Sequence, residues 1–93
     1  MAQPTRLLER TVLEAKYKIF NHLCIAYRRS GQNRVFRVRA EEVRIELAIP
    51  ENIFAEALTG FIDASNESIV EVFEQNGERY LRLGETAIFN LTD

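Results

Sequence analysis

Positively charged side chains are absent from residues 46–78, about a third of the chain. No lysine, arginine or histidine lies between Glu46 and Glu78. The same stretch carries eight carboxylates, Glu46, Glu51, Glu56, Asp63, Glu67, Glu71, Glu74 and Glu78. Proteins hold DNA largely by neutralising its phosphates with Lys and Arg, and a surface built from this stretch alone cannot do so. Such a surface must bind DNA in an unusual way or bind something else.

Cysteine and histidine are scarce, and their scarcity excludes several kinds of site. The single cysteine, Cys24, excludes an internal disulfide framework and is typical of a reducing compartment. The single histidine, His22, lies two residues from Cys24 on a predicted helix, so the two side chains do not share a helical face. The sequence also lacks a glycine-rich phosphate loop, a cluster of metal ligands and a nucleophile signature. We therefore expect a protein that is not an enzyme and that needs no metal or cofactor.

Long hydrophobic runs are also missing. No stretch approaches the length of a membrane span, and the first eight residues lack the apolar region of a signal peptide. We therefore expect a cytoplasmic protein that makes no use of a membrane. The 93 residues, 46% hydrophobic and 28% charged, predict one domain over residues 1–93. Its core is modest, so dimerisation would add to its stability.

The two halves of the chain have opposite charge. Residues 1–45 carry ten Lys and Arg against four Asp and Glu, whereas residues 46–93 carry two against ten. The formal charges are +6 and −8, which agree with the net charge of −2. Ten of the twelve basic residues are arginine, which makes planar two-point contacts with phosphate or carboxylate. Either the halves neutralise each other within one fold, or the basic half forms a functional patch.

The N-terminal part predicts one long helix over residues 5–30, where glycine and proline are absent. Two apolar stripes run along it at helical spacing, one through Leu8, Val12, Ala15, Ile19, Leu23 and Ala26, the other through Leu13, Tyr17, Phe20, Cys24 and Tyr27. Together they form an arc wider than one core face of a small domain needs. The helix is either a central core helix or, in addition, the surface of a homodimer. We expect the homodimer.

The rest of the chain predicts short elements of both kinds. Residues 34–39 alternate in part and predict a short strand, and two helices separated by Pro50 are predicted within residues 40–64. A hairpin follows over residues 68–84, with Asn76-Gly77 as its two-residue turn, and residues 85–93 form a C-terminal tail. The predicted fold class is therefore α+β.

The turn at Asn76-Gly77 also predicts the register of the hairpin. The expected pairs are Glu74 with Arg79, Phe73 with Tyr80, Val72 with Leu81, Glu71 with Arg82 and Val70 with Leu83. These pairs comprise two ion pairs, one aromatic pair and two aliphatic pairs. A slip by one residue would destroy all of them, so we expect this register.

This order of elements, with the segments VRAEEV (38–43), LAIPEN (47–52) and residues 54–61, resembles the winged helix-turn-helix superfamily, which includes many transcription regulators. The resemblance covers about residues 10–85 and rests on element order and apolar spacing. It implies three helices, a short strand and a C-terminal hairpin that serves as the wing. In such proteins the third helix enters the major groove of DNA, and the wing touches the flanking backbone.

The resemblance assigns roles to residues before Pro50 and on the third helix. Core positions are Leu47, Ile49, Phe54, Leu58 and Phe61, and the outward face comprises Glu51, Asn52, Ala55, Glu56 and Thr59. Asn52 could pair with adenine, but Glu51 and Glu56 would be repelled by phosphates. The wing adds no free base, because its two arginines face glutamates in the predicted register. The acidic stretch therefore lies where the superfamily normally contacts DNA.

Two functions remain open at this point. The first is a DNA-binding transcription regulator that contacts double-stranded DNA through Arg28, Arg29, Arg34, Arg37, Arg39, Arg44 and Asn52. In the alternative interpretation, those arginines pair with the acidic half or form a solvated face. The second function is a protein–protein interaction module that uses Glu51, Ile53, Glu56 and Thr59 on the third helix. The base rate of the superfamily slightly favours DNA, and the side chains of the third helix favour protein.

Overall fold

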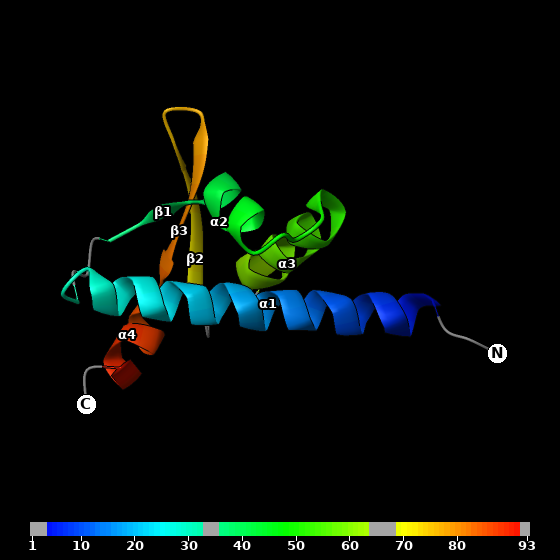
Figure 1. Ribbon diagram of the computed structural model, residues 1–93, viewed down its shortest axis with the longest axis horizontal. Helices are drawn as coiled ribbons and strands as arrows, with labels where there is room; N and C mark the ends of the chain where they lie inside the picture. The colour runs from blue at the N-terminus through cyan, green and yellow to red at the C-terminus, as the bar shows by residue number, and fades with distance from the viewer. Residues whose placement is uncertain (1–3, 33–35, 64–68, 92–93) are drawn as a thin grey trace.

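The computed structural model describes residues 4–32, 36–63 and 69–91. Over these residues the chain is an α+β protein with four helices and a three-stranded antiparallel sheet (Figure 1). The elements are α1 (Pro4–Arg29), β1 (Val38–Arg39), α2 (Ala40–Glu46), α3 (Glu51–Asp63), β2 (Val70–Gln75), β3 (Glu78–Leu83) and α4 (Glu85–Leu91). In Figure 1 the sheet, α2 and α3 stand on one side of the long helix α1.

Helix α1 matches the helix predicted over residues 5–30. Its core face is narrow and comprises Ala15, Ile19, Leu23 and Tyr27, each at most 4% exposed. Gly31 follows the helix with a φ of +80°, and the N–H of Gln32 donates to the carbonyl of Tyr27 at 3.1 Å. Glycine has no Cβ to clash in this left-handed conformation, so Gly31 ends the helix.

Helices α2 and α3 are joined by a four-residue turn. Backbone N–H groups of the turn close it, because Leu47 donates to the carbonyl of Val43 at 3.0 Å and Ile49 donates to that of Arg44 at 3.0 Å. Ala48 takes a φ of +55°, which reverses the chain before Pro50. Strand β1 is shorter than the predicted strand at residues 34–39, since only its last two residues pair with β3. Residues 34 and 35 of that prediction lie outside the described residues.

The hairpin has the predicted register. All five expected pairs occur between β2 and β3, and the Phe73 and Tyr80 rings stack with their centroids 5.8 Å apart. The strand order is β1-β3-β2, because β1 pairs with the other edge of β3. This pairing places Arg39 opposite Tyr80. Strand β3 is therefore the central strand, and Leu81 on it is fully buried.

The turn of the hairpin gives a direct prediction. Asn76 and Gly77 have φ values of +55° and +79°, the left-handed pair that a type I′ turn needs. Gly77→Ala should cost about 1–2 kcal/mol of stability, because L-residues are strained there and nothing else lies within 4 Å of the new Cβ. Gly60→Ala is the matched control. The added Cβ would lie 3.0 Å from Nζ of Lys16, at the flexible end of that side chain. Alanine is also favoured over glycine within a helix by up to about 1 kcal/mol.

Urea denaturation of both variants measures these effects. The midpoint should fall for Gly77→Ala and should stay or rise for Gly60→Ala. Equal losses in the two variants would contradict the turn geometry.

The end of the chain differs from the prediction. Residues 85–91, assigned from the sequence to a C-terminal tail, form helix α4. Ala87 and Ile88 are buried in the core, and the N–H of Ile88 donates to the carbonyl of Gly84 at 3.0 Å. The helix is only seven residues long, so its apolar periodicity is too short to recognise in the sequence. It forms because Ala87 and Ile88 join a core built by the other elements.

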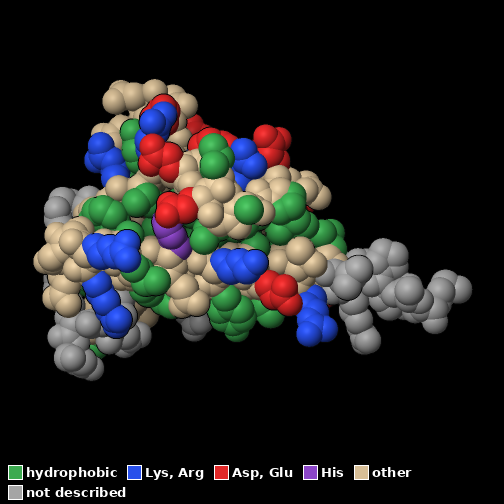
Figure 2. All heavy atoms as spheres, in the orientation of Figure 1, with side chains coloured by type: hydrophobic (Ala, Val, Ile, Leu, Met, Phe, Trp, Pro, Cys, Tyr) green, Lys and Arg blue, Asp and Glu red, His purple; other side chains and the backbone are tan. Residues whose placement is uncertain are grey.

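Charged side chains of both signs lie on the visible surface. Figure 2 shows Asp and Glu intermixed with Lys and Arg above α1, whereas Lys and Arg stand in separate groups along α1 itself.

Among the described helices, none combines the length and apolar character needed to cross a membrane.

Candidate functional site on the face of α2, α3 and the hairpin

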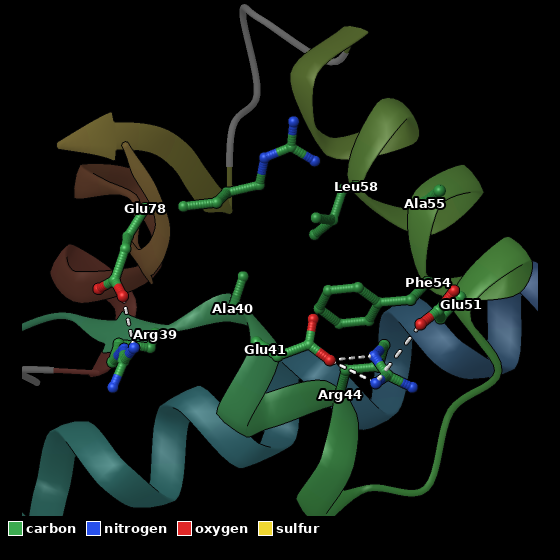
Figure 3. A pocket seen from close by; sticks show the side chains of 10 residues that line it. Arg39, Ala40, Glu41, Arg44, Glu51, Phe54, Ala55, Leu58 and Glu78 are labelled. Atoms are coloured by element: carbon green, nitrogen blue, oxygen red, sulfur yellow. Dashed lines mark hydrogen bonds and ion pairs between the residues drawn. The ribbon is translucent and has the colours of Figure 1, made fainter. Parts of the chain in front are cut away.

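A pocket of about 390 Å³ opens between α2, α3 and the start of β3 (Figure 3). Its apolar floor is formed by Ala40, Phe54, Ala55 and Leu58. Its charged rim is formed by Arg39, Glu41, Arg44, Glu51, Glu78 and Arg79. We call this the α2–α3 pocket.

The floor of the pocket is an extension of the core. Ala40, Phe54 and Leu58 are 4%, 6% and 2% exposed, and Ala40 starts α2 directly after β1. Phe54 and Leu58 are four residues apart, so they lie on the same side of α3. The short turn between α2 and α3 holds these side chains together, which makes the floor a fixed feature of the fold.

Arg44 is tied to both helices of the pocket. Its Nε donates to Oε1 of Glu41 at 2.7 Å, and its guanidinium lies 3.9 Å from the carboxylate of Glu51. It also donates to the backbone carbonyl of Ile49 at 3.4 Å. The hydrogen bond to Glu41 is the main reason why the pKa of Arg44 is raised above its ordinary value. Arg44 therefore bridges α2 and α3 as a partner of carboxylates.

Arg39, on the other side of the pocket, also pairs with carboxylates. Its guanidinium donates to Oε1 of Glu78 and lies 3.6 Å from Glu42 (Figure 3 shows the pair with Glu78). The hydrogen bond with Glu78 raises the pKa of Arg39. Arg39 and Arg44 were both predicted to contact DNA, and each is bound to two carboxylates instead of facing solvent alone.

The two arginines of the hairpin are paired as the sequence predicts. Arg79 lies 3.6 Å from Glu74, and Arg82 donates to Glu71. Arg82 also lies over the Phe73 ring, 5.1 Å from its centroid. These contacts confirm the two ion pairs expected from the hairpin register.

The outward side of α3 is acidic, and one predicted site residue does not belong to it. Glu51, Asn52, Glu56 and Thr59 are exposed, and the Thr59 hydroxyl donates to the carbonyl of Ala55 at 3.0 Å. Ile53, in contrast, is only 8% exposed. The prediction that Ile53 offers an exposed protein contact is wrong, because α3 packs against both α1 and β2 and so buries a wider arc.

The five described arginines proposed for DNA lie at the end of α1, on and beside β1, and on α2. Arg28 and Arg29 are exposed at the C-terminal end of α1. Arg37 lies over the Tyr80 ring, 4.9 Å from its centroid, on the outer side of the sheet. Arg34 lies outside the described residues. Arg39 and Arg44 belong to the pocket rim, and Arg37 adjoins Arg39 because both lie against Tyr80.

His22 and Cys24 take separate environments. His22 Nε2 lies 3.7 Å from Glu46, and Cys24 is half-buried against the core. Burial raises the pKa of the Cys24 thiol, and Arg28 opposes this effect. Within the described part of the chain, no group of three or more His, Cys, Asp and Glu side chains could hold a metal ion.

Sequence reasoning missed the pocket itself. The pocket residues that it did not assign to a site are Ala40, Glu41, Phe54, Ala55, Leu58, Glu78 and Arg79. Their meeting depends on β1 pairing with β3, a long-range contact that no turn or periodicity signals. No family model, no curated protein and no solved structure matches this chain.

Proposed function

We propose that this chain is a non-catalytic winged-helix domain that binds a protein partner through the face of α2, α3 and the hairpin. The element order, the four-residue turn between α2 and α3, and the strand order β1-β3-β2 support the winged-helix assignment. In this assignment α3 is the third helix, and β2 and β3 are the wing. The charge and the shape of the face indicate the kind of partner.

The charge of the face is the observation that carries the proposal. Three carboxylates of the pocket rim and three beside it form what we call the acidic face: Glu41, Glu51, Glu78, Glu42, Glu56 and Glu74. Three guanidiniums, from Arg39, Arg44 and Arg79, stand among them and are bound to five of the six carboxylates. Arg37 adds a fourth guanidinium, because it lies over the Tyr80 ring, whose hydroxyl donates to Glu78. The face therefore has two negative charges in excess, which disfavour phosphate and favour basic side chains.

The α2–α3 pocket defines the second requirement for a partner. Its apolar floor of Phe54 and Leu58 offers a place for one large apolar side chain. Protein-binding sites often centre on such an anchor surrounded by a polar rim. We infer that the partner segment carries Lys or Arg on either side of a bulky apolar residue.

A peptide array tests this proposal. The array holds three sets of immobilised 12-residue peptides: Lys or Arg flanking Leu or Phe, the same charges flanking Ala, and Glu flanking Leu or Phe. The proposal expects binding only to the first set, because both the charge and the anchor are needed. Equal binding to all three sets, or to the acidic set, would overturn it.

A DNA-binding function is the second candidate, and one observation favours it. Arg28 and Arg29 are exposed at the end of α1, away from the acidic face, and Arg37 is exposed on the sheet. Backbone contacts of this kind would lose affinity steeply as salt increases. In that case Arg28→Ala with Arg29→Ala should lower the affinity for duplex DNA and reduce the salt dependence.

A further inference from the structure

An apolar stripe on α1 remains on the surface of the described structure. Leu13 and Tyr17 are 47% and 62% exposed. Phe20 and Cys24 continue the stripe and are half-buried against the core. The spacing of four, three and four residues keeps all four on one side of the helix, which is the heptad pattern of paired helices. We call these residues the α1 stripe.

The stripe is separate from the core face of the same helix. Ile19 and Leu23, on the core face, are buried beneath the other elements, whereas Leu13 and Tyr17 point away from them. In Figure 1 the sheet, α2 and α3 lie above α1, α4 lies below its C-terminal end, and no described element is drawn below its N-terminal half. Figure 2 shows hydrophobic side chains along that lower edge. Large apolar side chains in a row of this kind are usually covered by another surface.

We propose that the α1 stripe pairs with the same stripe of a second copy of this chain, with the two helices antiparallel. A two-fold axis between them places Tyr17 opposite Phe20 of the second copy and Leu13 opposite Cys24 of the second copy. Such an interface is self-complementary, because every contact occurs twice.

The charges beside the stripe determine the direction of the pair. Glu14 and Arg28 are exposed on the same flank of the stripe, seven residues on either side of Asn21. Glu14 lies 3.7 Å from Arg10 of its own helix, and in the antiparallel arrangement it also reaches Arg28 of the second copy, so each Glu14 lies between two guanidinium groups. In a parallel arrangement Glu9 would meet Glu14 of the second copy, which is repulsive. Complementary charge thus favours the antiparallel pair.

The pairing leaves the acidic face open. Helices α2 and α3 lie on another side of α1 from the stripe, so a dimer would present two acidic faces (Figure 1). A partner with two basic segments would then bind more tightly than either segment alone. The dimer itself does not depend on the proposed partner, and each can fail without the other.

Sedimentation velocity over about 1–500 µM protein tests the pairing. One helix pair is a small interface, so a dissociation constant of about 1–100 µM is expected. The wild-type chain should shift from 10.8 kDa to twice that mass. Tyr17→Asp should remain a monomer, whereas Ile25→Asp should still dimerise, because Ile25 is 53% exposed but lies on another side of α1. A monomer at every wild-type concentration, or equal behaviour of the two variants, would overturn the proposal.

An engineered disulfide tests whether the two α1 helices run antiparallel. In Leu13→Cys, mild oxidation should link the introduced thiol to Cys24 of the second copy, since these positions face each other in the antiparallel pair. Peptide mapping of the cross-linked dimer identifies the bond. Links between two introduced thiols or between two Cys24 residues would show a parallel pair and contradict the proposal.

Discussion

Replacing both Glu51 and Glu56 with lysine is expected to lower the affinity for the best basic peptide of the array by about 30- to 100-fold. The two residues are exposed on α3, and Glu51 forms part of the pocket rim. The double variant changes the charge of the face by four units and turns attraction into repulsion. A loss of about 2–3 kcal/mol, spread over two exposed positions, corresponds to this change in affinity. Fluorescence anisotropy with the labelled peptide measures it.

The matched control is Glu9→Lys with Glu85→Lys. Both glutamates are exposed, and neither lies on the acidic face, so the net charge changes equally while the face does not. The control should bind the peptide within about twofold of the wild type. Similar losses in the two double variants would mean that only the net charge matters. The Glu51 and Glu56 variant should also gain affinity for duplex DNA, because two repelling carboxylates have become bases.

The largest expected loss of stability follows from Leu81→Ala. Leu81 is fully buried on the central strand β3, where it faces Val38 of β1 and Val72 of β2. Truncation of a leucine at such a site leaves a cavity and costs about 2–5 kcal/mol. Domains of this size have about 5–15 kcal/mol of stability in total, so the variant should be partly unfolded on mild heating. Urea denaturation monitored by circular dichroism measures the loss.

Ile45→Ala is the control for that experiment. Ile45 is a large aliphatic residue of α2 but is 64% exposed, so its truncation should change the stability by less than about 0.5 kcal/mol. A loss below about 1 kcal/mol for Leu81→Ala would show that β3 does not occupy the centre of the sheet.

The parts of the fold that could be predicted from the sequence depend on local patterns. Helix α1 follows from its two apolar stripes and from the absence of glycine and proline, and its end follows from Gly31. The hairpin register follows from the turn at Asn76-Gly77, because the turn alone determines which residues face each other. The ion pairs of Arg79 and Arg82 could therefore be predicted before any coordinates.

The parts that could not be predicted depend on long-range contacts. The pairing of β1 with β3 brings Arg39 to Glu78, although 39 residues separate them in the chain. Helix α4 needs the core in order to form. Ile53 was assigned to the surface because the sequence does not reveal that α3 packs on two neighbours. The pocket depends on all these contacts, so the sequence alone predicts only the acidic surface of α3 beside it.

The base-free stretch, residues 46–78, supplies most of the carboxylates of the acidic face. It supplies Glu51, Glu56, Glu74 and Glu78 of the acidic face, while Glu41 and Glu42 come from just before it. The arginines nearest to it are bound to its carboxylates. A nucleic acid approaching this face would have to displace those carboxylates and then overcome the remaining negative charge.

One measurement tests the central claim most directly. Wild-type protein at about 50 mM salt is titrated against a labelled 20-base-pair duplex of random sequence and, separately, against the best basic peptide of the array. The proposal predicts saturable binding of the peptide and no change in anisotropy with the duplex. Saturable duplex binding that weakens steeply with salt, and that is lost in Arg39→Ala with Arg44→Ala, would contradict it.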